Sequence, residues 1–204
     1  MPEPSKLIFL PGAGGSPAFW QPVSKLLIHP ASRKLLGWPG FGVVASDPKV
    51  KGIQDLVNLV LDEIDQPSAL IAQSMGGVIA IQAALRRADL VTHLVLTVTS
   101  GGVDISDLQV QDWRPGFLAA NPMIPRWFAD YQEDLSSAIA SVHIPTMLLW
   151  GDTDPISPVA VGKRLAGLLP QSKMHVFPGG EHDLANTLAA KVAPLIDKHL
   201  KNAV

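Results

Sequence analysis

Cysteine is absent from the chain, and so is any long hydrophobic segment. Without cysteine, the 204 residues can form no disulfide, no thiolate nucleophile and no cysteine-ligated metal site. The apolar run at residues 7–10 is too short for a secretion signal, and no run approaches the roughly 20 apolar residues that span a bilayer. We therefore expect a cytoplasmic protein with no membrane partner.

Charged residues are scarce as well, at 17% of the chain against 47% hydrophobic residues. The formal net charge is −2, and neither lysine nor arginine forms a run, which leaves a nucleic-acid or anionic membrane surface without electrostatic support. A chain of this length and composition buries a sizeable core, and we predict a single domain over residues 1–204. We expect its partner to be a small molecule, and the sequence does not specify an oligomeric state.

Short apolar runs alternate with segments that are apolar at helical spacing. The runs predict strands at residues 7–10, 69–72, 94–99, 144–150 and 173–177. The helical spacing predicts helices at residues 19–27, 53–64, 75–88 and 158–168, with a last helix that ends near residue 200. This alternation is typical of a mostly parallel, doubly wound α/β sheet flanked by helices.

The stretch around Ser74 reads as a strand, a sharp turn and a helix. Ala72 and Gly76, two residues before and after the serine, are small enough for the two backbones to approach each other closely. Such a turn holds its serine in a strained conformation at the carboxyl end of the sheet, with the helix N-terminus directed at it. Ser74 is therefore a candidate nucleophile, and an ordinary strand-to-helix turn is the alternative.

Three motifs resemble those of the α/β-hydrolase fold. Residues 72–76, Ala-Gln-Ser-Met-Gly, resemble its nucleophile elbow, usually Gly-x-Ser-x-Gly, with Ala72 in place of the first glycine. Residues 151–158 resemble the acid loop of that family at every fixed position, and residues 178–184 resemble its histidine loop. The resemblance covers almost the whole chain and implies an α/β-hydrolase fold with truncated N-terminal strands.

The resemblance also implies a catalytic triad in the family's order. Ser74 is the nucleophile, Asp154 the acid and His182 the base, and each follows a predicted strand, so that all three meet at one edge of the sheet. Two other carboxylates compete for the role of the acid. Asp152 is more plausible as a turn-forming carboxylate, and Asp104 takes the position at which some family members keep their acid.

A glycine-rich loop at residues 11–16 follows the first predicted strand. It lacks the lysine and the Ser/Thr of a P-loop and the spacing of a dinucleotide site, so that a glycine turn without a role is the remaining alternative. In the hydrolase family this place usually reads His-Gly-x, and here Pro11 replaces the histidine. The resemblance assigns the N–H groups of Ala13 and Met75 as donors to an oxyanion hole.

Residues 103–143 interrupt the alternation. They contain three prolines and a concentration of aromatic residues, which makes them too apolar for a linker and too irregular for another sheet unit. The resemblance implies a short lid over the active site, and we call residues 103–143 the lid segment. Trp113 and Trp127 are candidate walls of a substrate pocket, and packing of the lid segment onto the body is the alternative for at least one of them.

These observations predict a serine hydrolase, a carboxylesterase that acts on a small-molecule ester through an acyl-enzyme, with no cofactor and no metal. A thioesterase, a lactonase or a methyl-ester esterase for a carrier-bound acyl chain would use the same triad. The alternative from another class is a ligand-binding protein that retains the fold without catalysis.

Overall fold

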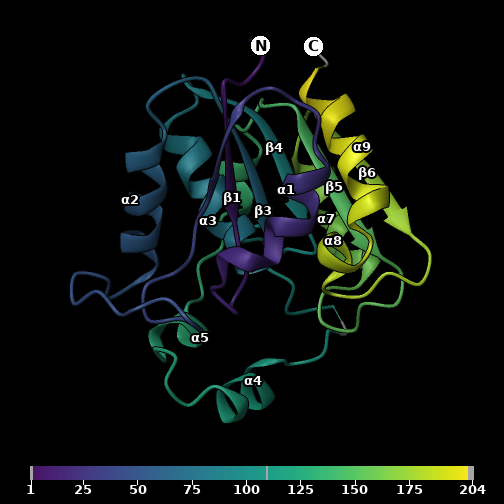
Figure 1. Cartoon of the computed structure of the whole chain (residues 1–204). Helices are drawn as coiled ribbons and strands as arrows, with labels where there is room; N and C mark the ends of the chain where they lie inside the picture. Colours follow the sequence, from purple (N-terminus) through teal and green to yellow (C-terminus); the bar gives the residue numbers. More distant parts are fainter. Residues whose placement is uncertain (1, 109, 202–204) are drawn as a thin grey trace.

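Parallel strands form the centre of the molecule. The computed structural model describes residues 2–108 and 110–201, and in this part of the chain six strands form one sheet in the order β2-β1-β3-β4-β5-β6 (Figure 1). The strands are β1 (Lys6–Leu10), β2 (Ser32–Leu35), β3 (Ser68–Gln73), β4 (Val91–Thr97), β5 (Thr146–Gly151) and β6 (Ser172–Phe177). All five neighbouring pairs are parallel, which confirms the predicted fold class.

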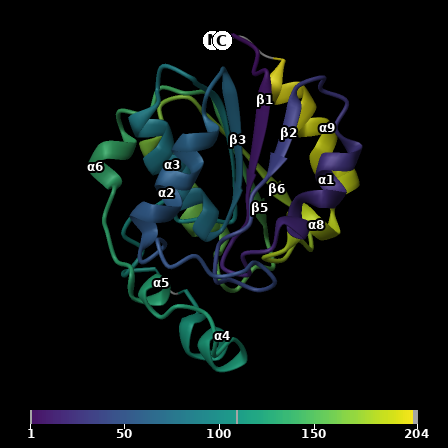
Figure 2. The same ribbon diagram turned by 60° about the vertical axis from the view of Figure 1, so that its left-hand side comes forward.

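Helices cover both faces of this sheet (Figure 2). On one face, α1 (Gln21–Leu26), which follows the 3-10 helix η1 (Pro17–Trp20), packs against α9 (Ala189–Leu200), with the short α8 (Leu184–Thr187) beside them. On the other face lie α2 (Ile53–Glu63) and α3 (Met75–Arg86). The helix α7 (Val159–Leu168) is next to α3, since Leu165 and Ile81 both approach Gly101.

This two-sided cover explains the continuous apolar runs of the central strands. Every residue of β3, β4 and β5 is buried, because neither face of a doubly wound sheet meets water. The edge strand β2 is different: its sequence Ser-Arg-Lys-Leu is mostly exposed and forms no apolar run, so the sequence pattern does not predict it. No helix in the described part of the chain is long and apolar enough to span a bilayer.

The lid segment contains several short helices. These are α4 (Arg114–Ala120), α5 (Trp127–Asp130) and α6 (Ser136–Ile139), and residue 109 of the segment lies outside the described residues. Both views place α4 and α5 at the same end of the molecule, away from the termini (Figures 1 and 2). The segment returns to the body at Leu135, which is buried and whose N–H donates to the carbonyl of Gly102.

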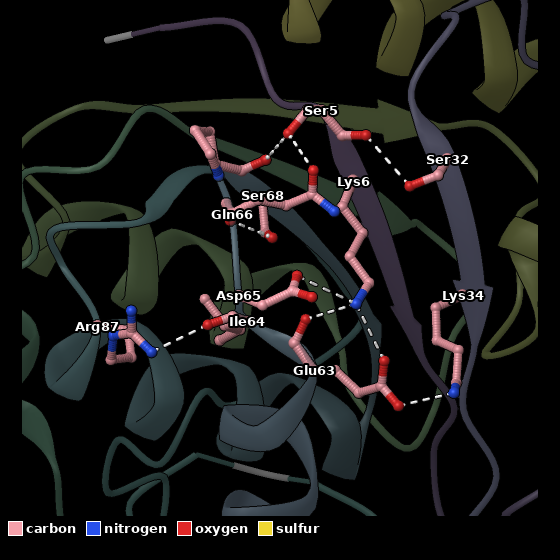
Figure 3. A network of polar contacts seen from close by, with 11 residues as sticks. Ser5, Lys6, Ser32, Lys34, Glu63, Ile64, Asp65, Gln66, Ser68 and Arg87 are labelled. Carbon is pink, nitrogen blue, oxygen red and sulfur yellow. Dashed lines mark hydrogen bonds and ion pairs between the residues drawn. The ribbon is translucent and has the colours of Figure 1, made fainter.

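A polar network closes the opposite end of the sheet (Figure 3). The ammonium of Lys6 donates to the backbone carbonyl of Glu63, the last residue of α2, at 2.7 Å, and lies 3.1 Å from its carboxylate. Lys34 binds the other carboxylate oxygen of Glu63 at 2.7 Å. These two cations hold the pKa of Glu63 below its usual value, with the hydrogen bond from Lys34 as the main cause. The cations also offset the negative end of the α2 dipole, so that this end of the sheet is fixed to the helix layer.

The helix α9 is joined to the sheet by His199. Its Nε2–H donates to the carbonyl of Leu94 in β4 at 3.0 Å, and its ring meets the buried ring of His93 edge-on at 5.2 Å. Burial, followed by the proximity of His93, lowers the pKa of His199 from 6.5 to about 4. The folded protein therefore holds this imidazole neutral at pH values at which the unfolded chain protonates it.

We predict that His199 makes the protein less stable in mild acid. Between about pH 6.5 and about pH 4 the unfolded state binds a proton that the folded state does not, so the free energy of unfolding falls as the pH falls through this window. In urea unfolding, His199→Gln should reduce the loss between about pH 7 and about pH 4.5 by on the order of 2 kcal/mol. An equal loss in the wild type and the variant would contradict this role.

Candidate active site

Ser74 lies between the last residue of β3 and the first residue of α3. Its backbone has φ 52° and ψ −123°, in a region that non-glycine residues rarely occupy. Its N–H donates to the carbonyl of Thr97 in β4 at 2.9 Å, and its carbonyl accepts from Gly77 at 2.9 Å. Such a conformation costs on the order of 1–3 kcal/mol and persists where the surrounding structure enforces it.

The surroundings of the turn explain why small residues flank the serine. A Cβ on Gly76 would lie 2.5 Å from the carbonyl oxygen of Pro11 and 2.8 Å from that of Leu10, and backbone cannot move aside. Only glycine fits at this position. Ala72 is a sheet residue, fully buried in register with Leu10 and Leu96, and its methyl group is accommodated there. The departure of Ala72 from the usual glycine thus leaves the turn intact.

The side chain of His182 lies within hydrogen-bond distance of side chains from two other loops. Nε2 of His182 is 3.0 Å from Oγ of Ser74, and Nδ1 of His182 is 2.8 Å from Oδ2 of Asp154. The carboxylate of Asp154 is fully buried, and its other oxygen accepts from the N–H groups of Ile156 and Ser157 at 2.8 and 3.0 Å. Because a carboxylate only accepts, Nδ1 of His182 carries a proton, which leaves Nε2 free to accept from the Ser74 hydroxyl.

The competing carboxylates have other partners. Asp152 accepts from the backbone N–H of Gly179 at 2.7 Å, which is the turn role expected for it. Asp104 accepts from the backbone N–H and the hydroxyl of Ser106. Among the described residues, neither of these two carboxylates contacts His182.

The glycine-rich loop lies directly against the serine. A Cβ on Gly12 would be 3.1 Å from the Cβ of Ser74. The next peptide group, which carries the N–H of Ala13, is therefore also close to Ser74. Met75 is the first residue of α3, where backbone N–H groups have no partner within the helix. In the part of the chain that the structure describes, no protein acceptor receives the N–H of Ala13 or of Met75. Both donors are therefore available to a ligand.

Two features near the serine were not predicted from the sequence. The buried side chain of Gln73 donates from Nε2 to the carbonyl of His182 at 3.1 Å. Thr153 donates from its N–H and its hydroxyl to the carbonyl of Gly180, at 3.1 and 2.7 Å, and so joins the acid loop to the histidine loop. The one available signal for the first was a polar residue that ends an apolar strand immediately before the serine.

The two predicted pocket tryptophans lie in an aromatic cluster. Trp113 packs against Phe117 and Phe128, each with ring centroids 5.5 Å apart, and Trp127 meets Phe41 edge-on at 5.8 Å. Both tryptophans are partly exposed, and the packing of the lid segment accounts for these contacts. Their role as pocket walls, like that of the segment as a lid, stays a prediction.

No group of three or more histidine or carboxylate side chains among residues 2–108 and 110–201 is arranged to hold a metal ion. Arg114 donates to the carbonyl of Ala129 at 2.9 Å and lies over the ring of Trp113. It is engaged within the lid segment itself.

Two family models match the chain. One, described as "Alpha/beta hydrolase family", matches residues 7–136, and one described as "alpha/beta hydrolase fold" matches residues 116–185.

The curated relatives include a 2-hydroxy-6-oxononadienedioate/2-hydroxy-6-oxononatrienedioate hydrolase of Pseudomonas putida, 38% identical over 65 residues. That match covers 32% of this chain and only 20% of the relative, so the chain spans about a fifth of its length. A pimeloyl-acyl-carrier-protein methyl ester esterase of Legionella pneumophila is 26% identical over 212 residues, which cover 86% of this chain and 87% of the relative.

Solved structures give the same picture of the fold. A meta-cleavage product hydrolase from Pseudomonas fluorescens matches with a TM-score of 0.78 at 18% identity, over 97% of this chain and 90% of the other. A thermophilic esterase from Thermogutta terrifontis matches with a TM-score of 0.78 at 21% identity, over 96% of this chain and 89% of the other. Likeness at these identities establishes the fold alone.

We predict that the two neighbouring carboxylates differ sharply in their effect on hydrolysis. Asp154→Asn should lower kcat for a p-nitrophenyl ester by on the order of 10³- to 10⁴-fold, because the amide no longer orients and stabilises the histidine. Asp152→Asn is the matched control: it keeps an oxygen that accepts from Gly179, and should cost less than about tenfold. The reverse order of the two effects would move the acid to Asp152.

Proposed function

The chain belongs to the alpha/beta hydrolase family, and from this premise we propose that it is a serine hydrolase that cleaves a carboxylic ester through an acyl-enzyme. One observation carries the proposal: the hydrogen-bonded series from Ser74 through His182 to the buried Asp154. A serine, a base and a carboxylate in this order form the arrangement that activates a hydroxyl near neutral pH.

In the first half of the reaction, Oγ of Ser74 attacks the ester carbonyl carbon while Nε2 of His182 takes its proton. Asp154 accepts from Nδ1 throughout, so that the imidazolium formed is stabilised and its ring stays in place. The tetrahedral intermediate collapses, the alcohol leaves with the proton from Nε2, and the acyl group remains on Ser74. The strained backbone supports this role, because it holds the hydroxyl out at the carboxyl edge of the sheet.

The negative charge of the intermediate develops on the former carbonyl oxygen. The N–H groups of Ala13 and Met75 would donate to it, and the N-terminus of α3 adds its positive dipole end. Loss of one such donor typically costs about 3 kcal/mol of transition-state stabilisation. Neither donor has a protein acceptor among residues 2–108 and 110–201, which supports this assignment.

In the second half, water replaces the alcohol. Nε2 of His182 takes a proton from the water while the water oxygen attacks the acyl carbon. The second intermediate then collapses: the bond from the acyl carbon to Oγ of Ser74 breaks, Nε2 returns the proton to Oγ, and the acid leaves. Every step uses groups of this chain and requires no cofactor.

The charge of the lid segment favours a small ester over a protein-bound one. Residues 103–143 carry six acidic residues against two arginines, a formal net charge of −4, of which Asp107 is paired with Arg164 of α7. Arg114 is engaged within the segment. An acidic carrier protein would meet like charge at this end of the molecule. We therefore propose a small neutral ester as the substrate, with the tryptophans of the lid segment, Trp113 and Trp127, against its acyl part.

A carrier-bound methyl ester is the second candidate substrate. The observation in its favour is the match to methyl ester esterases for a carrier-bound acyl chain, which extends over most of both chains. A thioesterase or a lactonase would use the same groups. A purely ligand-binding role is disfavoured, because a scaffold has no need of a strained serine and two unpaired N–H donors beside it.

We predict that a fluorophosphonate probe labels the protein at Ser74. The wild type should be labelled, Ser74→Ala should not, and Ser172→Ala should be labelled like the wild type, because Ser172 lies at the start of β6, at the opposite edge of the sheet. An unlabelled wild type, or equal labelling of Ser74→Ala, would overturn the proposed function.

A substrate panel separates the candidates. It comprises p-nitrophenyl esters of increasing acyl length, acyl thioesters of matched length, and a methyl ester on an acyl carrier protein. We expect the highest kcat/KM for a free ester, and a carrier substrate that improves as salt screens the repulsion. A preference for the carrier substrate at low salt would replace the first candidate by the second.

A further inference from the structure

Gln73 connects the loops that meet at the candidate active site. It is the last residue of β3 and is joined by its backbone to Ser74, and its side chain is 5% exposed. A buried amide at this position is unexpected on composition alone, since the other five residues of β3 are one serine, two alanines, a leucine and an isoleucine, all buried in the sheet core. What the amide touches therefore decides its role.

On one side the amide holds the histidine loop. Nε2 of Gln73 donates to the backbone carbonyl of His182 at 3.1 Å. The loop is also held at Gly180, whose carbonyl accepts twice from Thr153, and at Gly179, which donates to Asp152. Those contacts fix the loop to the acid loop. The bond from Gln73 instead links the backbone of His182, the residue that carries the imidazole, to β3.

On the other side the amide limits how closely the glycine-rich loop can approach β3. A Cβ on Gly12 would lie 2.2 Å from Oε1 and 3.1 Å from Cδ of the Gln73 side chain, so the backbone of this loop is packed directly onto the amide. The next peptide carries the N–H of Ala13. The position of this N–H relative to Ser74 thus depends on where the side chain of Gln73 lies.

We propose that Gln73 is a positioning residue: its side chain sets the placement of His182 and of the Ala13 N–H relative to Ser74. The inference rests on the proposed hydrolase function and adds a residue that the triad motif does not contain. Gln73 touches no reacting atom in this scheme. It acts by keeping three loops in register, and a misplacement of about 1 Å costs on the order of 100-fold in rate.

Gln73→Met removes the amide and nearly preserves the length of the side chain. We expect kcat for a p-nitrophenyl ester to fall by about tenfold or more, KM to change by less than about twofold, and fluorophosphonate labelling to slow in parallel with kcat. Thr146→Val is the matched control, because it also removes one buried hydrogen bond to a backbone carbonyl. Thr146 is the first residue of β5, at the end of the sheet opposite to Ser74. This variant should lower stability without lowering kcat.

Gln73→Glu provides a readout that a merely structural role would not move. Its carboxylate cannot donate to the carbonyl of His182, and its charge lies beside the loop that carries the imidazolium formed during the reaction. The acidic limb of the kcat/KM profile should shift to higher pH in Gln73→Glu and stay in place in Gln73→Met. If Gln73→Met does not fold, Gln73→Asn, which keeps the amide but is one methylene too short, takes its place with the same expected loss.

The two proposals fail in different ways. A wild type that neither reacts with the probe nor hydrolyses esters overturns the proposed function. A wild type that does both, with Gln73→Met or Gln73→Asn within about twofold of it in kcat and an unshifted profile for Gln73→Glu, overturns the positioning role alone.

Discussion

The close approach of two backbones at Ser74 is the constraint on which the rest of the structure depends. The end of β1 and the start of α3 lie so near that a Cβ on Gly76 would meet two carbonyl oxygens, and Ser74 is held at φ 52° between them. Strain of this kind, on the order of 1–3 kcal/mol, is offset by the fully buried strands on either side. The backbone strain at Ser74 is thus a local destabilisation that the burial of the sheet core compensates.

The two ends of the sheet have different roles. At one end, Lys6 and Lys34 tie the last turn of α2 to the first strands, and His199 ties α9 to β4, so that the helix layers are fixed. At the other end, the strands stop at loops that bond to one another, as Thr153 does to Gly180. The strands and the bonded loops together bring Ser74 and Asp154, which lie 108 and 28 residues before His182 in the sequence, to 3.0 and 2.8 Å from its ring nitrogens.

The fold, and the proximity of the three central residues of the candidate site, were predictable because their signals are local. Strands β3, β4 and β5 are buried on both faces and appear as continuous apolar runs, while Ser74, Asp154 and His182 each follow such a run in motifs with fixed neighbours. The edge strand β2 gives no such signal, because water covers part of it and its residues are polar. The single turns of α5 and α6 are too short for a helical period to show.

Contacts between loops that are distant in the sequence were not predictable. Nothing in the order of residues indicates that Gln73 reaches the carbonyl of His182, or that Gly180 packs on Gly151, because such contacts depend on where the chain ends of three strands meet. The same limit applies to Trp113 and Trp127, whose aromatic character was evident and whose partners, Phe41 and Phe128 among them, were not.

In the proposed reaction, Ser74 carries the acyl group during hydrolysis. The most direct measurement is rapid acid quenching of the wild-type protein with an excess of a p-nitrophenyl ester, followed by mass spectrometry of its peptides. We expect an adduct of the mass of the acyl group on the peptide that contains Ser74, formed as fast as the first equivalent of p-nitrophenol is released. Turnover of the ester with no adduct on that peptide, or with an adduct on another residue, would contradict it.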